Sequence, residues 1–128
     1  MKLRILSQSF TVCQVSDFSQ APLQSEFCFL GKTDEECSLV CVTEDVPANT
    51  VAREDGWRGL RVEGQLDFSL TGILSGLAGV LAQHRIPIFA VSTFNTDYLL
   101  TKAADFPRAV AVLAEAGYEI VGTETVEG

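Results

Sequence analysis

The sequence is poor in the side chains on which most catalytic and nucleic-acid-binding sites depend. It has one histidine, His84, and only nine Lys and Arg against 17 Asp and Glu, for a formal net charge of −8. One imidazole leaves few acid–base arrangements, and scattered cations do not neutralise a phosphate backbone. We therefore expect no catalytic residue, no enzyme activity and no nucleic-acid partner.

Long apolar runs are also missing. The uncharged stretch at residues 68–82 contains glycine, serine and threonine, and it is shorter than the about 20 apolar residues that a membrane-spanning helix needs. The N-terminal residues lack the apolar core and cleavage site of a signal peptide. These absences predict a cytoplasmic protein that does not contact a membrane.

The cysteines form no recognisable metal motif. Cys13, Cys28, Cys37 and Cys41 lie among β-type residues without a Cys-x-x-Cys pair, and such spacing gives little support for zinc. We expect free, buried thiols that pack as small hydrophobic side chains, with no metal and no cofactor.

The hydrophobic pattern predicts an α+β protein with two parts. Strands are expected at residues 3–15, 26–31 and 38–43, and the Thr-Asp-Glu-Glu run at 33–36 resembles a capping box that would begin a short helical turn. A polar connection at 45–56 separates these strands from a strand at 60–64, a helix at 70–84, strands at 86–94 and 98–102, a helix at 106–116 and a strand at 118–122. The order βαββαβ predicts a ferredoxin-like sheet with both helices on one face. The expected parts are a helix-poor, strand-rich half at 1–56 and a complete βαββαβ domain at 57–128.

The first predicted helix carries a stripe of glycines beside its apolar stripe. Gly72, Gly76 and Gly79 recur at helical spacing, and each costs roughly 0.5–1 kcal/mol of helix stability relative to alanine. Close packing explains Gly76 and Gly79 best, whereas Gly72 is equally consistent with a ligand anion that approaches the helix start. His84, at the other end, is expected to be a helix-end packing or capping residue.

A polar interruption in the strands at 86–102 predicts a ligand site. A hairpin turn explains Asn95 and could also account for Asp97. It does not explain Ser92 and Thr93, which interrupt the strand before the turn and supply hydroxyl groups beside this carboxylate. In a βαββαβ fold this hairpin lies near the start of the first helix, whose free N–H groups suit a carboxylate. An acceptor for an ammonium group and donors for a carboxylate would thus come together, as an α-amino acid requires.

These residues resemble the ACT domain family. The likeness is carried by the segments 66–74 and 88–100, above all by Ser-Thr-Phe-Asn-Thr-Asp-Tyr at 92–98, and it extends to 29–41 and 56–64. The most similar branch contains the regulatory domains of aspartokinases and the cytosolic arginine sensor of the mTOR pathway, together with small bacterial tandem-ACT proteins. One departure is Thr71, which stands where many ACT domains have proline before this glycine.

The resemblance implies a non-catalytic sensor that binds an amino acid at an interface between ACT modules. It implies an ACT-like N-terminal half docked on a complete ACT domain, and a homodimer, since ACT modules commonly associate side by side. Gly72, Ile73, Thr93 and Asp97 match ligand-contacting positions of the family, and we expect their neighbours Thr71 and Ser92 to belong to the same ligand-binding site. An unidentified protein partner would receive the signal.

Two other functions remain open. A regulatory adaptor with no retained ligand would keep the fold and lose the site, although the intact Ser-Thr run followed by Asp97 argues against it. A small enzyme that uses only carboxylates is less well supported, because the sequence has no phosphate loop, zinc spacing or nucleophile elbow. The identity of the amino acid is left open.

Overall fold

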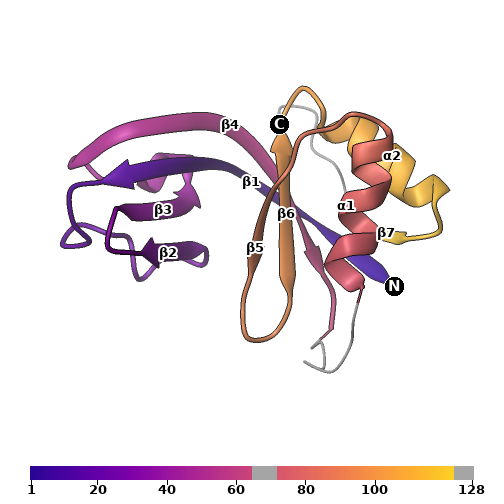
Figure 1. Ribbon diagram of the computed structural model, residues 1–128, viewed down its shortest axis with the longest axis horizontal. Coiled ribbons are helices and arrows are strands. Elements are labelled where there is room, and N and C mark those ends of the chain that lie inside the picture. Colours follow the sequence, from indigo (N-terminus) through magenta and orange to yellow (C-terminus); the bar gives the residue numbers. More distant parts are fainter. Residues whose placement is uncertain (65–71, 123–128) are drawn as a thin grey trace. The chain divides into compact units, whose positions relative to one another are not determined.

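The computed structural model describes residues 1–64 and 72–122, and the chain divides into two compact units. Met1–Ser7 and Arg58–Gly128 form one, here called the helical unit, and Gln8–Trp57 form the other, the strand unit. Strands β1 (Lys2–Val15) and β4 (Thr50–Val62) contribute residues to both units (Figure 1). The predicted division at residue 57 differs from this one at the N-terminus, because Met1–Ser7 join the helical unit.

The strand unit is built on an antiparallel sheet. Strand β3 (Cys37–Val42) pairs with β1 on one side and with β2 (Cys28–Lys32) on the other, with Cys41 opposite both Thr11 and Cys28. A short 3₁₀ helix, η1 (Thr43–Asp45), follows β3. A small core includes Cys13, Val15, Leu39 and Cys41, so the β-rich reading of this part is confirmed.

The expected helical turn at residues 33–36 is wrong. These residues close the β2–β3 hairpin, in which the N–H of Thr33 donates to the carbonyl of Glu36 at 3.0 Å. The Thr33 hydroxyl still accepts hydrogen bonds from the N–H groups of Glu35 and Glu36, at 3.1 and 3.2 Å. The side chain therefore satisfies the same donors as a helix cap would, but in a turn.

The helical unit has the predicted order β4, α1, β5, β6, α2, β7. Its elements after β4 are α1 (Ile73–Gln83), β5 (Phe89–Ser92), β6 (Asp97–Lys102), α2 (Phe106–Glu115) and β7 (Glu119–Val121). Strand β6 lies between β4 and β5, and the N-terminal part of β1 lies between β4 and β7, pairing in parallel with β7. Leu3 and Ile5 enter the core of this unit, which explains why the first seven residues belong to it.

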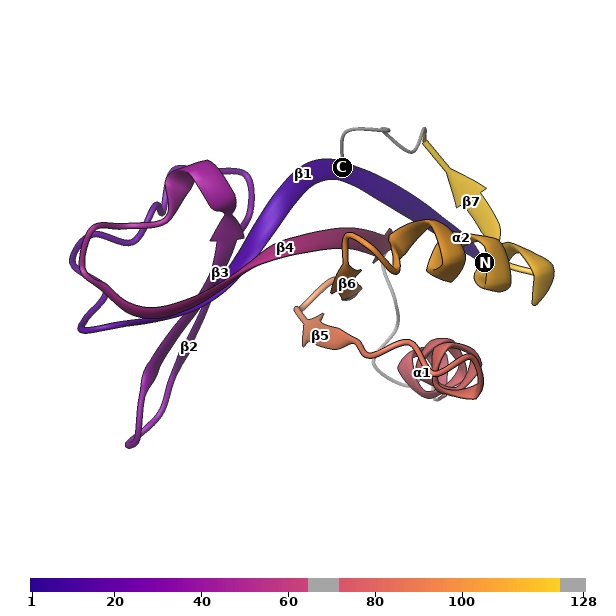
Figure 2. The same cartoon turned by 90° about the horizontal axis from the view of Figure 1, so that it is seen from above.

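Both helices pack on one face of this sheet, as predicted. Leu77 and Leu81 of α1, and Phe106, Ala109 and Leu113 of α2, share one buried cluster with strand residues. The helices also contact each other, and Figures 1 and 2 show both of them within the helical unit. The core is therefore between the helices and one face of the sheet.

The C-terminal ends of both helices follow standard capping rules. Helix α1 ends with Arg85 at φ 58°, and the N–H groups of Arg85 and Ile86 donate to the carbonyls of Ala82 and Leu81, which is a Schellman motif. Helix α2 ends in the same way at Gly117, with φ 108°. His84 is the C-cap of α1 and its Nδ1 lies 3.0 Å from the Val80 carbonyl, so its predicted place at a helix end is confirmed.

Two strand boundaries differ from those expected. Strand β4 begins at Thr50, so most of the expected polar connection at 45–56 is extended strand, and β5 is shorter than the predicted 86–94. Neither charged side chains nor exposure prevents strand formation where a neighbouring strand pairs with the backbone. Within residues 1–64 and 72–122, no helix is long and apolar enough to cross a membrane.

Candidate functional site

The hairpin between β5 and β6 brings two of the predicted site residues together. Ser92 and Asp97 are direct partners in the strand register, and the Ser92 hydroxyl donates to Oδ1 of Asp97 at 2.7 Å. Leu99, two residues after Asp97, lies in the core under the helices, and side chains alternate along a strand. Ser92 and Asp97 therefore lie on the face of the sheet that carries α1 and α2.

Thr93 has a role within the turn. Its N–H and its hydroxyl both donate to the carbonyl of Thr96, at 2.8 and 3.1 Å. The buried hydroxyl of Thr96 in turn donates to the carbonyl of Val62 at 2.7 Å. The Thr93 bonds close the turn, and the Thr96 bond attaches the turn to the end of β4.

Among the described residues, no side chain occupies the backbone donors at the start of α1. Gly72 precedes the helix with φ 79°, a conformation that favours glycine. Among the described residues, no side chain caps the helix and no acidic residue lies in its first turn. A Cβ added to Gly72 would meet no described atom within 4 Å, so an anion could approach the backbone at Gly72 and Ile73. Thr71 lies outside the described residues.

The other two glycines differ from each other. A Cβ on Gly76 would lie 3.2 Å from the Tyr118 hydroxyl oxygen, whereas one on Gly79 would meet nothing described within 4 Å. Close packing therefore explains Gly76, as predicted. For Gly79 the described residues provide no such contact.

The hairpin turn and the start of α1 lie at the same end of the helical unit (Figure 1). This arrangement follows from topology, because α1 runs back along the sheet after β4 and the hairpin follows β5. Asp97 and Ser92 thus offer an acceptor on the helix-bearing face, near the end at which the helix presents its N–H groups.

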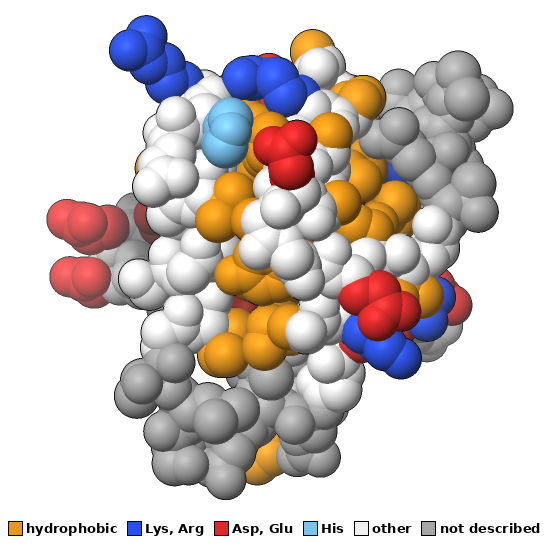
Figure 3. Space-filling view, turned by 90° about the vertical axis from the view of Figure 1, so that its right-hand side faces the viewer, with side chains coloured by type: hydrophobic (Ala, Val, Ile, Leu, Met, Phe, Trp, Pro, Cys, Tyr) orange, Lys and Arg blue, Asp and Glu red, His pale blue; other side chains and the backbone are white. Residues whose placement is uncertain are grey.

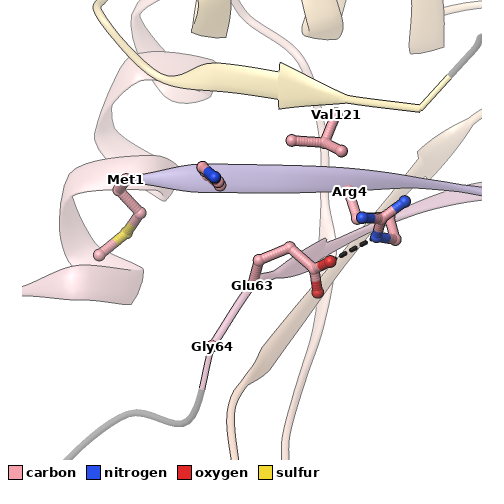
Figure 4. A pocket seen from close by; sticks show the side chains of 6 residues that line it. Met1, Arg4, Glu63, Gly64 and Val121 are labelled. Carbon is pink, nitrogen blue, oxygen red and sulfur yellow. Dashed lines mark hydrogen bonds and ion pairs between the residues drawn. The ribbon is translucent and has the colours of Figure 1, made fainter.

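A second group of polar residues lies on the opposite face, and the sequence reading missed it. Glu63, directly after β4, accepts a hydrogen bond from Nε of Arg4 on β1 (Figure 4). It accepts another, at 3.4 Å, from Nε of Arg61. The hydrogen bond from Arg4 is the largest influence on the carboxyl group of Glu63 and holds its pKa below the ordinary value. No local motif indicates this cluster, since Arg4 and Glu63 are 59 residues apart.

The cysteines are free thiols in the strand unit. Cys13 and Cys41 are buried, and Cys28 and Cys37 pack beside them. Burial raises the pKa of Cys13 and Cys28, and it raises that of Cys41 to about 12. Thiols of this kind are poor nucleophiles, and the described part of the chain contains no group of His, Cys, Asp or Glu arranged to hold a metal ion.

Comparison with known proteins identifies the family. The sequence model of the ACT domain matches residues 52–115, which is half of the chain. The chain belongs to the ACT domain family. This ACT protein has no match among the curated proteins searched.

Solved structures agree with this membership. A crystal structure of an Agobacterium tumefaciens protein matches this ACT protein with a TM-score of 0.84 and 29% identity, over 97% of this chain and 96% of that one. A Vibrio cholerae protein of unknown function, titled as a possible transport protein, has a TM-score of 0.69 and 16% identity, over 89% and 88% of the two chains. The allosteric aspartate kinase of Clostridium acetobutylicum shares the fold with a TM-score of 0.62 and 14% identity, over 86% of this chain and 33% of the enzyme. The predicted likeness to the aspartokinase branch is confirmed.

Proposed function

We propose that this ACT protein is a regulatory, non-catalytic module that binds an amino acid. The observation that carries the proposal is the Ser92–Asp97 pair, which lies on the helix-bearing face at the end where α1 begins. In the proposed complex, the Asp97 carboxylate accepts hydrogen bonds from the ligand's ammonium group. The N–H groups at Gly72 and Ile73 donate to its carboxylate.

The remaining residues have supporting roles in this proposal. Ser92 orients the Asp97 carboxylate, Thr93 shapes the turn, and Thr71 precedes the glycine at the helix start. Catalysis receives no support from the described residues, because the buried thiols are poor nucleophiles and His84 caps a helix. Family membership and the fold shared with an allosteric kinase favour ligand sensing over an adaptor without a ligand.

We also propose that the protein works as a homodimer in the cytoplasm and that a second ACT module covers the ligand. We further propose that the N-terminal part, residues 1–56, is a degenerate ACT-like half, as the resemblance implies. Figure 3, which views the side carrying α1 and α2, shows apolar side chains with few charges between them. Among the described strands β5 also ends the sheet order, and exposed edge strands are commonly covered by a partner.

Thermal unfolding with each proteinogenic amino acid tests the proposal. One or a few amino acids should raise the melting temperature of the parent protein, and replacing Asp97 with alanine should remove most of that rise. If no amino acid raises the melting temperature, the adaptor becomes the better explanation.

A further inference from the structure

The sheet of the helical unit has a second face, turned away from its helices. Leu3 and Ile5 of β1 and Val62 of β4 are buried under the helices. Because side chains alternate along a strand, Arg4, Arg61 and Glu63 lie on the opposite face. This is not the face on which the amino acid is proposed to bind.

One carboxylate holds two guanidinium groups on this face. Oε1 of Glu63 accepts from Nε of Arg4, and Oε2 accepts from Nε of Arg61 at 3.4 Å. The Arg4 and Arg61 side chains are 41% and 31% exposed, and the Glu63 side chain is 25% exposed. Guanidinium groups present further N–H donors in a planar fork that matches carboxylate and phosphate oxygens. Glu63 therefore occupies the position that an external oxyanion would take.

Two cavities adjoin at this carboxylate. One of about 490 Å³ is lined by Arg4 and Lys2, with Met1 and Val121 as apolar walls (Figure 4). The other, of about 220 Å³, is lined by Arg61 and Tyr98 together with the hairpin turn. Glu63 and Gly64 line both. Each guanidinium thus borders a space open to solvent, and the one beside Arg4 has the volume of a small-molecule site.

The described residues in this group carry a net charge opposite in sign to that of the whole protein. Lys2, Arg4 and Arg61 supply three cations, against Glu63 and Glu119, which faces Lys2 in the β1–β7 register. The formal charge of this group is +1, in a protein of net charge −8. A positive group at a cavity in an acidic protein concentrates small anions at that place.

We propose that Arg4 and Arg61 form a binding site for a small molecule that carries a carboxylate or phosphate group. The ligand displaces Glu63, which acts as a built-in competitor and keeps the two guanidinium groups in place when the site is empty. A small molecule is favoured over an acidic protein segment because the cations border two cavities of limited volume. This site is independent of the proposed amino-acid site.

The competition makes an unusual prediction about Glu63. Replacing it with glutamine retains the size of the side chain but removes the negative charge that competes for the guanidinium groups. Glu63→Gln should bind an oxyanion about tenfold more tightly than the parent does. In the parent, the anion must first replace the charge-assisted hydrogen bonds between Glu63 and the arginines, whereas in the variant these bonds are weaker. Arg4→Gln and Arg61→Gln should each weaken binding by about tenfold or more.

The experiment titrates the full chain, at low ionic strength, with inorganic phosphate and separately with succinate. The Nε–H signals of Arg4 and Arg61 in nitrogen–proton NMR spectra report occupancy, and circular dichroism checks that each variant is folded. Arg85→Gln is the matched control, because it removes the same charge from an exposed residue at the end of α1. Arg4→Lys keeps the charge but loses the fork, and it should also weaken binding.

We expect the parent to show shifts that saturate with the anion. Both arginine variants should bind more weakly, Arg85→Gln should bind as the parent does, and Glu63→Gln should bind more tightly. Shifts that never saturate with either anion, or binding in Glu63→Gln no tighter than in the parent, would overturn the proposal. Saturable binding of phosphate but not of succinate would restrict the ligand to phosphorylated molecules. Saturable binding of succinate but not of phosphate would restrict it to carboxylates. Saturation only by a hexaglutamate peptide would replace the small molecule with an acidic protein segment. Asp97→Ala should leave anion binding unchanged, so that this test and that of the amino-acid site can fail separately.

Discussion

The Ser92 hydroxyl and the Asp97 carboxylate are joined by a 2.7 Å hydrogen bond across the last pair of residues before the β5–β6 turn. The bond fixes one carboxylate oxygen, Oδ1, and leaves the rest of the group's acceptor capacity for other donors. Because this face of the sheet carries α1, the carboxylate lies where it can serve a ligand held by the helix start.

Asp97→Ala should weaken amino-acid binding by about one to two powers of ten, because a charged hydrogen bond contributes roughly 1.5–3 kcal/mol. A saturating ligand should raise the melting temperature of the parent by roughly 8–15 °C. The variant should lose most of that rise and remain folded without ligand. Asn95→Ala is the control, since this exposed turn residue should retain the full shift. Equal binding by Asp97→Ala and the parent would refute the site.

Glu63 should make part of the protein's stability depend on pH. Its folded-state pKa lies below the ordinary 4.5, so the stability it contributes is present above that value and is lost as the pH falls through the folded pKa. Urea unfolding of the parent and of Glu63→Gln should therefore differ by a constant amount near neutral pH and by less in acid. If the difference in free energy of unfolding between the two proteins does not shrink in acid, the Arg4–Glu63 pair is not its source.

The cysteines should remain free and unreactive in the folded protein. Cys41 is 0% exposed and its pKa is raised to about 12 by burial, so iodoacetamide should label it slowly until the protein is unfolded. Single Cys→Ser variants should bind the amino acid as the parent does. Stoichiometric zinc in protein purified without added metal, or a disulfide that survives mild reductant, would contradict this prediction.

Two glycines of α1 should respond differently to alanine. Gly79→Ala should raise the free energy of unfolding by about 0.5–1 kcal/mol, because it improves helix propensity without a described neighbour within 4 Å of the new methyl group. Gly76→Ala should raise the free energy of unfolding by less, because its methyl group would lie 3.2 Å from the Tyr118 hydroxyl oxygen. Tyr118→Phe should restore the gain in the Gly76 variant. Equal gains for both glycines would argue against the Tyr118 contact.

The protein should sediment as a homodimer at micromolar concentration, and its melting temperature should rise with protein concentration. The apolar helix surface and the edge position of β5 supply the physical reason. A strict monomer at high micromolar concentration would remove the dimer from the proposed function.

Local signals accounted for most of the helical unit. The apolar stripe of Leu77 and Leu81 predicted the buried face of α1, and the polar residues after β5 predicted the turn that joins Ser92 to Asp97. The turn at Thr33 was misread because the same hydroxyl can accept from successive N–H groups in a helix cap or in a hairpin turn. Which of the two forms depends on whether flanking strands pair.

The sequence by itself determined the βαββαβ order, the family and the place of His84 at a helix end, because periodicity and capping act within a few residues. Only the tertiary structure decided that Leu3 belongs to the core of the helical unit, that Arg58 is buried over the ring of Phe106, and that Arg4 meets Glu63. These relationships join residues far apart in the chain and depend on strand register, in which a shift of one residue moves each side chain to the other face. No local pattern specifies that register.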